Sequence, residues 1–108
     1  MLKGYNFTRK DEINSQSATP LQNAKNEIVT VTACATTTRP DNETGEEVTV
    51  GLLVTKEYGT MSTISKTAVR GLDMIIDYMN DEEITELPVL VKSGKSNAGR
   101  EFITLEIQ

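Results

Sequence analysis

Histidine and tryptophan are both absent from the 108 residues, and cysteine occurs once, as Cys34. Without histidine, a Cys–His pair, a Ser–His–Asp triad and a histidine-bearing zinc site are all excluded. Histidine is the commonest general base near neutral pH, so its absence also argues against an enzyme and leaves only carboxylate chemistry open. A single cysteine permits no internal disulfide, and in the run VTACATT we expect Cys34 to be a small buried apolar residue. We expect no catalytic site, no cofactor and no metal centre.

Long apolar runs are absent as well. None approaches the roughly 20 residues needed to cross a membrane, and the opening MLKGYNFTRK lacks the apolar core of a signal peptide. The apolar fraction of 37% and the charged fraction of 25% are those of a globular protein. The length suits one domain with one core. We therefore expect a single-domain cytoplasmic protein that does not contact a membrane.

The net charge of −5 argues against a protein with a simple basic patch, but the charges are unevenly placed. Residues 27–51 carry a net charge of −4 and residues 71–87 a net charge of −6. The three remaining segments, 1–26, 52–70 and 88–108, are each net positive. A fold that separates these segments would have a basic groove on one side and an acidic face on the other.

Residues 1–26 are polar and show neither a helical nor a strand period, so we expect a loosely ordered arm there and a folded domain over 27–108. Tyr5 and Phe7 could pack on that domain or contact a partner. Alternating apolar and β-branched residues predict strands within 27–38, 47–55, 61–65, 88–93 and 100–108. An apolar stripe with helical spacing predicts a helix over 65–81, with Ser65 as its N-cap.

This order, three strands, one helix and two strands, is that of the OB-fold. The expected fold class is therefore mostly β with one helix: a five-stranded OB-fold-like Greek-key barrel with the helix between strands three and four. The helix would plug one end of the barrel. Gly51, in the middle of the second strand, would mark a bulge or a close bend. An open α+β sheet with the helix across one face is the alternative.

In OB-folds the ligand lies across strands two and three, between the loops that join strands one to two and four to five. Here these loops are residues 39–47 and the sequence GKSNAGR, in which glycines let backbone N–H groups approach phosphate and Lys95 and Arg100 add charge. It is not a phosphate-binding P-loop, because the upstream glycine and the following helix are missing.

Aromatic side chains beside cations offer surfaces on which nucleobases stack. Phe102 should face outward if Ile103 faces the core, although it could instead pack against the N-terminal arm. Tyr58, at a hairpin tip, is either a contact or solvent-tolerant filler. The candidate nucleic-acid-binding residues are Lys56, Tyr58, Lys66, Arg70, Lys92, Lys95, Arg100 and Phe102.

Three stretches, TGEEVTVGLLVTKEYGTMSTIS, TAVRGLDMIIDYM and GKSNAGREFITLEI, give the sequence a resemblance to the small single-stranded-DNA-binding proteins encoded by phages of Gram-positive bacteria. The resemblance implies a non-sequence-specific protein that coats exposed strands in phage DNA replication or recombination, in the host cytoplasm. It leaves open RNA binding, a homo-oligomer and contact with replication proteins. The chain departs from such proteins in its five aromatic residues and in having no long acidic C-terminal tail. The alternative function is a small phage or mobile-element protein-interaction module that docks on a host factor.

Overall fold

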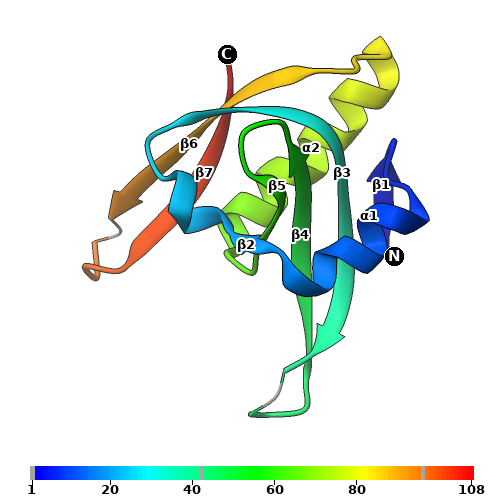
Figure 1. The fold of residues 1–108 in the computed structure, drawn as a ribbon. Helices are drawn as coiled ribbons and strands as arrows, with labels where there is room; N and C mark the ends of the chain where they lie inside the picture. Colours follow the sequence, from blue (N-terminus) through cyan, green and yellow to red (C-terminus); the bar gives the residue numbers. More distant parts are fainter. Residues whose placement is uncertain (1, 42, 96) are drawn as a thin grey trace.

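The computed structural model describes residues 2–41, 43–95 and 97–108. Asn42, in the predicted 39–47 loop, and Ser96, in GKSNAGR, lie outside the described residues. The described chain forms seven strands, two α-helices and two short 3-10 helices (Figure 1). Their bounds are β1 Lys3–Tyr5, α1 Arg9–Asn14, η1 Ser15–Ser17, β2 Thr19–Pro20, η2 Leu21–Ala24, β3 Ile28–Pro40, β4 Glu47–Thr55, β5 Gly59–Thr63, α2 Lys66–Glu82, β6 Leu87–Lys95 and β7 Glu101–Ile107.

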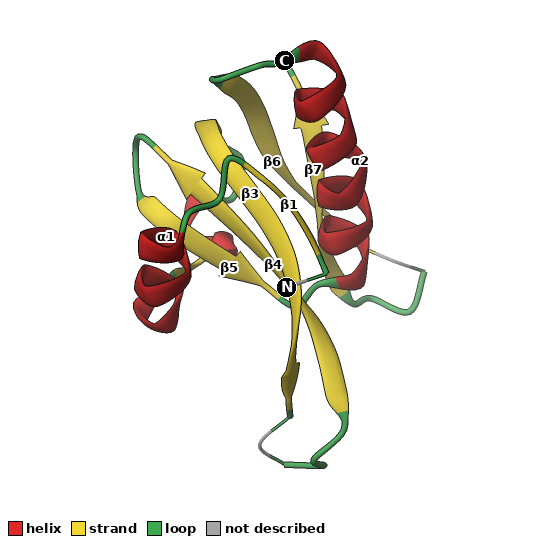
Figure 2. Cartoon of the chain, turned by 90° about the vertical axis from the view of Figure 1, so that its right-hand side faces the viewer, coloured by secondary structure: helices red, strands yellow, loops and turns green. Residues whose placement is uncertain are grey.

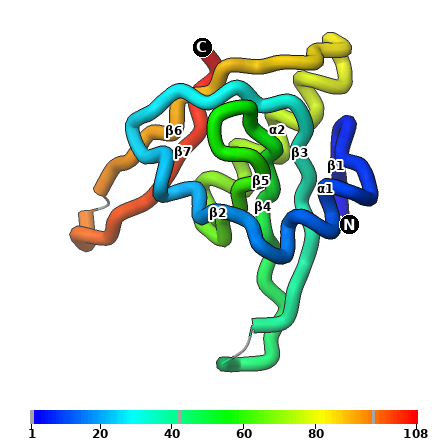
Figure 3. Tube along the Cα trace, in the orientation of Figure 1, coloured from blue at the N-terminus to red at the C-terminus, as the bar shows by residue number. Residues whose placement is uncertain are grey.

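The strands form one curled sheet, ordered β2-β5-β4-β3-β6-β7, with β1 added beside β3 (Figure 3). All pairs are antiparallel except β2 with β5, which makes the sheet mixed. The long strand β3 joins the two halves, because its first residues pair with β6 and the following ones pair with β4 and β1. A register shift between Val31 and Ala33 falls where β3 changes partners, and such bulges bend a strand.

The expected fold is correct in its barrel-like curl and wrong in its number of elements. Two strands and a helix precede the five predicted strands, so the long helix follows the fifth strand rather than the third. Within the described residues β5 and β7 do not pair with each other, and the sheet remains a half-barrel. The missed strands are two and three residues long, too short for an alternating pattern to reveal them.

Residues 2–26, here called the N-terminal segment, are regularly folded rather than loosely ordered. Helix α1 begins with a capping box, in which Thr8 and Asp11 each accept a hydrogen bond from the other's backbone N–H. Leu21 and Ala24 are almost completely buried in the core, which the polar composition of the segment did not suggest. The N-terminal segment therefore contributes side chains to the same core as the rest of the chain. The predicted division into an arm over residues 1–26 and a domain over residues 27–108 stays a prediction.

Helices α1 and α2 lie on opposite faces of the curled sheet (Figure 2). Apart from the half-buried Val69, the predicted apolar stripe of α2 is buried in a core shared with strands β3 to β7. Cys34 lies in this core beside Met79, as expected of a small apolar residue. Gly51 is paired in regular register and forms no bulge. A Cβ atom at Gly51 would lie 2.9 Å from Cδ2 of Leu72, so this glycine lets α2 approach the sheet. No helix in the described part of the chain is long and apolar enough to span a membrane.

Candidate nucleic-acid interface

The sequence predicted the ligand across its second and third strands, which are β4 and β5 of the structure. The face of β4 that points away from α2 is here called the outer face. Since Gly51 faces α2, the alternation of the strand turns Val50 and Leu52 to the outer face. These two residues are only 5% and 2% exposed, and Leu52 lies in a small pocket with Phe7 and Ser15 of the N-terminal segment. The segment crosses in front of β4 in Figure 1, and the Arg39 guanidinium donates to the Ser15 hydroxyl at 3.0 Å. The β4 part of the predicted ligand face is therefore covered by the chain itself, whereas Ser62 of β5 lines the open pocket described next.

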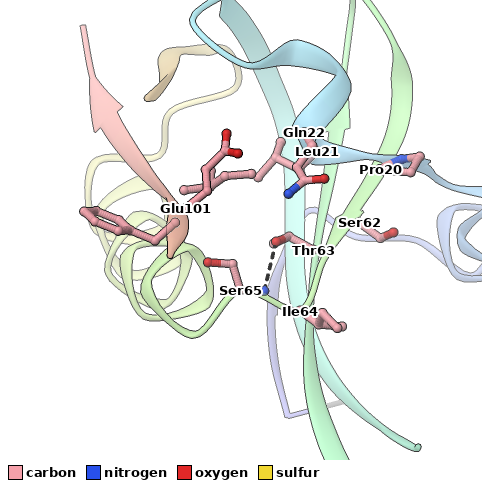
Figure 4. A pocket seen from close by; sticks show the side chains of 10 residues that line it. Pro20, Leu21, Gln22, Ser62, Thr63, Ile64, Ser65 and Glu101 are labelled. Atoms are coloured by element: carbon pink, nitrogen blue, oxygen red, sulfur yellow. Dashed lines mark hydrogen bonds between the residues drawn. The ribbon is translucent and has the colours of Figure 1, made fainter. Parts of the chain in front are cut away.

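A pocket of about 440 Å³, here called the seam pocket, lies where a closed barrel would join β5 to β7 (Figure 4). The nearly buried Leu21 and Ile103 give it an apolar floor. Hydroxyl and amide groups surround that floor, and the Thr63 hydroxyl accepts a hydrogen bond from the Ser65 N–H at 3.1 Å. The lining residues are Pro20, Leu21, Gln22, Ser62, Thr63, Ile64, Ser65, Glu101, Phe102 and Ile103.

Phe102 lines the seam pocket and is partly exposed, whereas its neighbour Ile103 is 3% exposed. This orientation agrees with the predicted alternation of β7. Gly94 pairs with Phe102 across the β6–β7 hairpin, and a Cβ atom at Gly94 would lie 2.8 Å from Cζ of the phenyl ring. The ring therefore lies against the glycine, which holds it at the surface next to the pocket.

Glu101 is an acidic group on the lining of the seam pocket, and its charge is balanced. Lys25, from the connection between η2 and β3, forms an ion pair with it. The hydrogen bond from Lys25 lowers the pKa of Glu101, and the nearby charges of Lys25 and Lys95 act in the same direction. Glu101 is thus an ionised but paired carboxylate and repels an approaching polyanion less than a lone one would.

Ile64 joins the seam pocket to a second pocket of about 880 Å³, here called the helix pocket, and its side chain is 69% exposed. The predicted cations Lys66 and Arg70 both line the helix pocket. Lys3 lines it too, but it is held by Asp77 at 2.7 Å and Asp73 at 3.4 Å, and the Asp77 hydrogen bond raises the pKa of Lys3. The seam pocket and the helix pocket therefore form one continuous surface, with the exposed Ile64 between them.

The hairpin of β6 and β7 carries three more of the predicted residues. Lys95 ends β6 opposite Glu101, and Arg100 precedes β7; both side chains are exposed. Lys92 faces Thr104, two residue pairs from Phe102 on the same face of the hairpin, with Nζ 3.8 Å from Glu106. Together with Phe102, these cations flank the seam pocket on the side opposite Lys66 and Arg70.

Lys56 and Tyr58 line neither the seam pocket nor the helix pocket, so the structure does not bring all the predicted residues together in one groove. Lys56 forms an ion pair with Glu86, just before β6, whereas Lys95 is the last residue of that strand. The stretch from Glu86 to Lys95 spans about 30 Å along the strand. The Tyr58 hydroxyl donates to Glu27 at 2.7 Å, and this hydrogen bond raises the pKa of Tyr58. A contact of these two residues with DNA stays a prediction that the geometry of the pockets does not support.

Of the residues that line the seam pocket, only Phe102 was among those predicted from the sequence. The missed ones include the exposed or partly exposed Gln22, Ser62 and Ile64. One signal was available, because Met61 is an inward residue of β5 and strand alternation then turns Ile64 outward at the end of the strand. An isoleucine at an outward position is a departure from the pattern. Gln22 carried no such signal, since its position depends on a 3-10 turn that packs by tertiary contact.

Comparison with known proteins bears on the whole of this arrangement. No curated protein and no solved structure matches the chain. A family model described as Phage Single-stranded DNA-binding protein matches residues 10–108. The match begins within α1 and so includes most of the N-terminal segment together with every strand from β2 to β7. The chain belongs to the family of phage single-stranded-DNA-binding proteins.

Proposed function

We propose that this protein coats single-stranded DNA without reading its sequence, during phage DNA replication or recombination. The observation that carries the proposal is the continuous surface from the β6–β7 hairpin through the seam pocket and Ile64 to the helix pocket. Phe102 supplies an aromatic ring near the middle of this surface, and cations stand on both sides of it. Family membership supports the choice of single-stranded DNA as the ligand.

The surface suits binding that tolerates any sequence. Every base has a π-face, so stacking on an aromatic ring contributes about 1–3 kcal/mol per base with little dependence on the base. Lysine and arginine side chains contact phosphates, which are the same at every nucleotide. Asp41 and Glu43, in the turn between β3 and β4, and the acidic residues at the end of α2 repel the backbone elsewhere. Glu46, Glu47 and Asp73 line the helix pocket itself, where Lys66 and Arg70 offset their charge. The strand is thereby confined to the surface between these acidic regions.

Titration of the protein into fluorescently labelled oligo-dT tests the proposal. A mixed-sequence oligonucleotide of the same length and a blunt duplex of the same length serve as controls. We expect the two single strands to bind with similar affinity and the duplex to bind more weakly. The logarithm of affinity should fall with the logarithm of salt concentration, with a slope of about −0.7 for each phosphate contacted. Absence of single-strand binding at low salt would contradict the proposal, as would strong preference for one sequence.

A further inference from the structure

From the seam pocket we infer a discrete base-binding subsite: one nucleobase of the bound strand enters between β5 and β7, while its phosphates stay outside on the flanking cations. The inference rests on the proposed function and specifies which part of the nucleotide the seam pocket binds, namely the base. It also moves the point of deepest contact from the outer face of the barrel to the opening between its two edge strands.

The central apolar side chains of the outer face are not accessible. Val50 and Leu52, which a base would meet there, are both buried, and Leu52 lies beside Phe7 and Ser15 of the N-terminal segment. The segment is anchored at its far end by Leu21 and Ala24, which are 1% and 0% exposed. A base could reach the outer face only if this anchored segment moved, whereas the seam pocket is open as it stands.

The lining of the seam pocket matches a base rather than a phosphate. The pocket has an apolar floor from Leu21 and Ile103 and neutral hydrogen-bonding groups from Gln22 and Ser62. Phe102 lies at its rim, with its ring against Gly94. A flat, uncharged heterocycle with polar edges matches these groups. A phosphate does not, because Lys25, which reaches Glu101, is already engaged in the ion pair with that carboxylate.

The position of the cations relative to the pocket also favours a bound base. Lys66 and Arg70 line the helix pocket, beyond Ile64, and Lys95 lies beyond Glu101 at the end of the hairpin. These side chains lie outside the seam pocket on its two sides. A backbone that contacts both groups must cross the mouth of the pocket, which places a base of the intervening nucleotide above Phe102.

Photo-cross-linking of the wild-type protein tests the subsite directly. Oligo-dT in which thymines are replaced by 5-iodouracil is bound, irradiated and digested with trypsin. We expect the main cross-link on the peptide Glu101–Gln108, which contains Phe102, with any second one on Asp11–Lys25, which contains Gln22. Cross-links confined to the peptide Asn26–Lys56, which carries the outer-face residues, would overturn the inference.

A matched pair of variants gives an independent measurement. Gln22→Trp fills the pocket from an exposed position, and Asn23→Trp adds the same ring at the next exposed residue, which does not line the pocket. We expect Gln22→Trp to weaken oligo-dT binding by about 5- to 150-fold, the effect of removing one base from its stacking surface, and Asn23→Trp to change it less than about twofold. Circular dichroism melts of both variants show whether either is unfolded. If wild-type protein binds oligo-dT but the two variants bind equally well, the subsite is wrong and strand coating stands; if wild-type protein does not bind, the proposed function itself fails.

Discussion

Phe102 illustrates how one residue position can serve both the fold and the ligand. Its ring covers Gly94, which has no side chain of its own to protect the strand, and an aromatic residue opposite a strand glycine commonly has this structural role. The ring also borders the seam pocket and remains partly exposed. The two roles are separable by experiment, because covering a glycine affects stability while stacking affects only binding.

Replacing Phe102 with alanine should weaken oligo-dT binding by about 1–3 kcal/mol, since one stacking surface is removed. The matched control is Tyr78→Ala, because Tyr78 is an aromatic residue that is 42% exposed on α2 and lines neither pocket. Fluorescence anisotropy, at a temperature where both variants are folded, measures the affinities. Equal reductions in affinity for the two variants would show that the ring at position 102 has no special role in binding.

Replacing Tyr58 with phenylalanine should lower the thermal stability without changing oligo-dT affinity, because the structure assigns its hydroxyl to Glu27. The folded-state pKa of Tyr58 is raised above the usual value of about 10, so the folded protein holds the phenolic proton more tightly than the unfolded chain. This contribution to stability is present below pH 10 and is lost as the pH rises through the folded-state pKa. Thermal melts are compared at pH 8 and at pH 10.5, which is on the order of half a unit above the usual pKa of tyrosine. Between these two pH values the melting temperature should fall more for wild type than for Tyr58→Phe. Parallel decreases would refute the assignment.

At the scale of elements, the N-terminal segment changes what the barrel can do. It adds β1 to the edge of β3 beyond the point where β6 departs, and β2 to the edge of β5. It also covers the outer face with α1 and the residues that follow it. The segment thus closes two surfaces that a bare five-stranded barrel would expose, and it leaves the seam between β5 and β7 open.

If the segment is part of the fold, removing its anchor must destabilise the whole protein. Leu21→Ala should reduce the free energy of unfolding by about 2–5 kcal/mol, because it leaves a cavity at a side chain that is 1% exposed. Ile13→Ala, in the same segment but 60% exposed, should change it by less than about 0.5 kcal/mol. Urea unfolding measures both. A stable Leu21→Ala variant would mean that the segment is only loosely attached.

Two glycine-to-alanine variants, for which we expect opposite changes in stability, test the contact between α2 and β4. Gly51→Ala places a Cβ atom against buried Leu72 and should destabilise the protein by about 1–3 kcal/mol. Gly71→Ala, within α2, meets Leu105 only at an ordinary 3.8 Å, and it should stabilise the protein by about 1 kcal/mol through helix propensity. Urea unfolding of the two variants gives both signs, and a Gly51→Ala variant as stable as wild type would contradict the close approach of the helix.

For the whole molecule, the arrangement of charge matters more than its sum. A protein with a net charge of −5 can bind a polyanion only where its cations are grouped and its carboxylates are paired or distant. The β6–β7 hairpin satisfies this condition on one side of the seam pocket, because Glu101 is paired with Lys25. On the other side, Lys66 and Arg70 share the helix pocket with Glu46, Glu47 and Asp73, of which Asp73 is paired with Lys3. Lys56, paired with Glu86, does not lie on this surface.

The double variant Lys66→Ala/Arg70→Ala should therefore bind oligo-dT more weakly and reduce the salt slope by about 0.7 for each phosphate that the protein no longer neutralises. The control, Lys10→Ala/Lys56→Ala, removes the same amount of charge from exposed positions that line neither pocket. Titrations at several salt concentrations give the slopes. If both double variants reduce the slope equally, the effect comes from net charge and the helix pocket plays no specific part.

The amino-acid pattern was sufficient where one face of an element is clearly apolar. The strand predicted over 47–55 is β4 at the same bounds, and the helix predicted over 65–81 is α2 displaced by one residue. The pattern failed in the N-terminal segment, where β1 and β2 are stabilised by the edges of β3 and β5 rather than by any period of their own. For the site, the pattern grouped Tyr58 with Phe102, whereas the structure places Tyr58 before β5 and Phe102 near the start of β7; their shared contact with DNA stays a prediction.

The order of the five longer strands and α2, the burial of Cys34, and the location of the acidic and basic segments along the chain all follow from the amino-acid sequence alone. These properties depend on local periodicity and on composition, which act over a few residues. Which face of the barrel is covered, which cations share a surface and where the opening lies became known only from the folded chain. Each of these depends on contacts between residues far apart in the chain, such as Leu21 in the core beneath the seam and Lys25 beside Glu101, and no local pattern encodes such contacts.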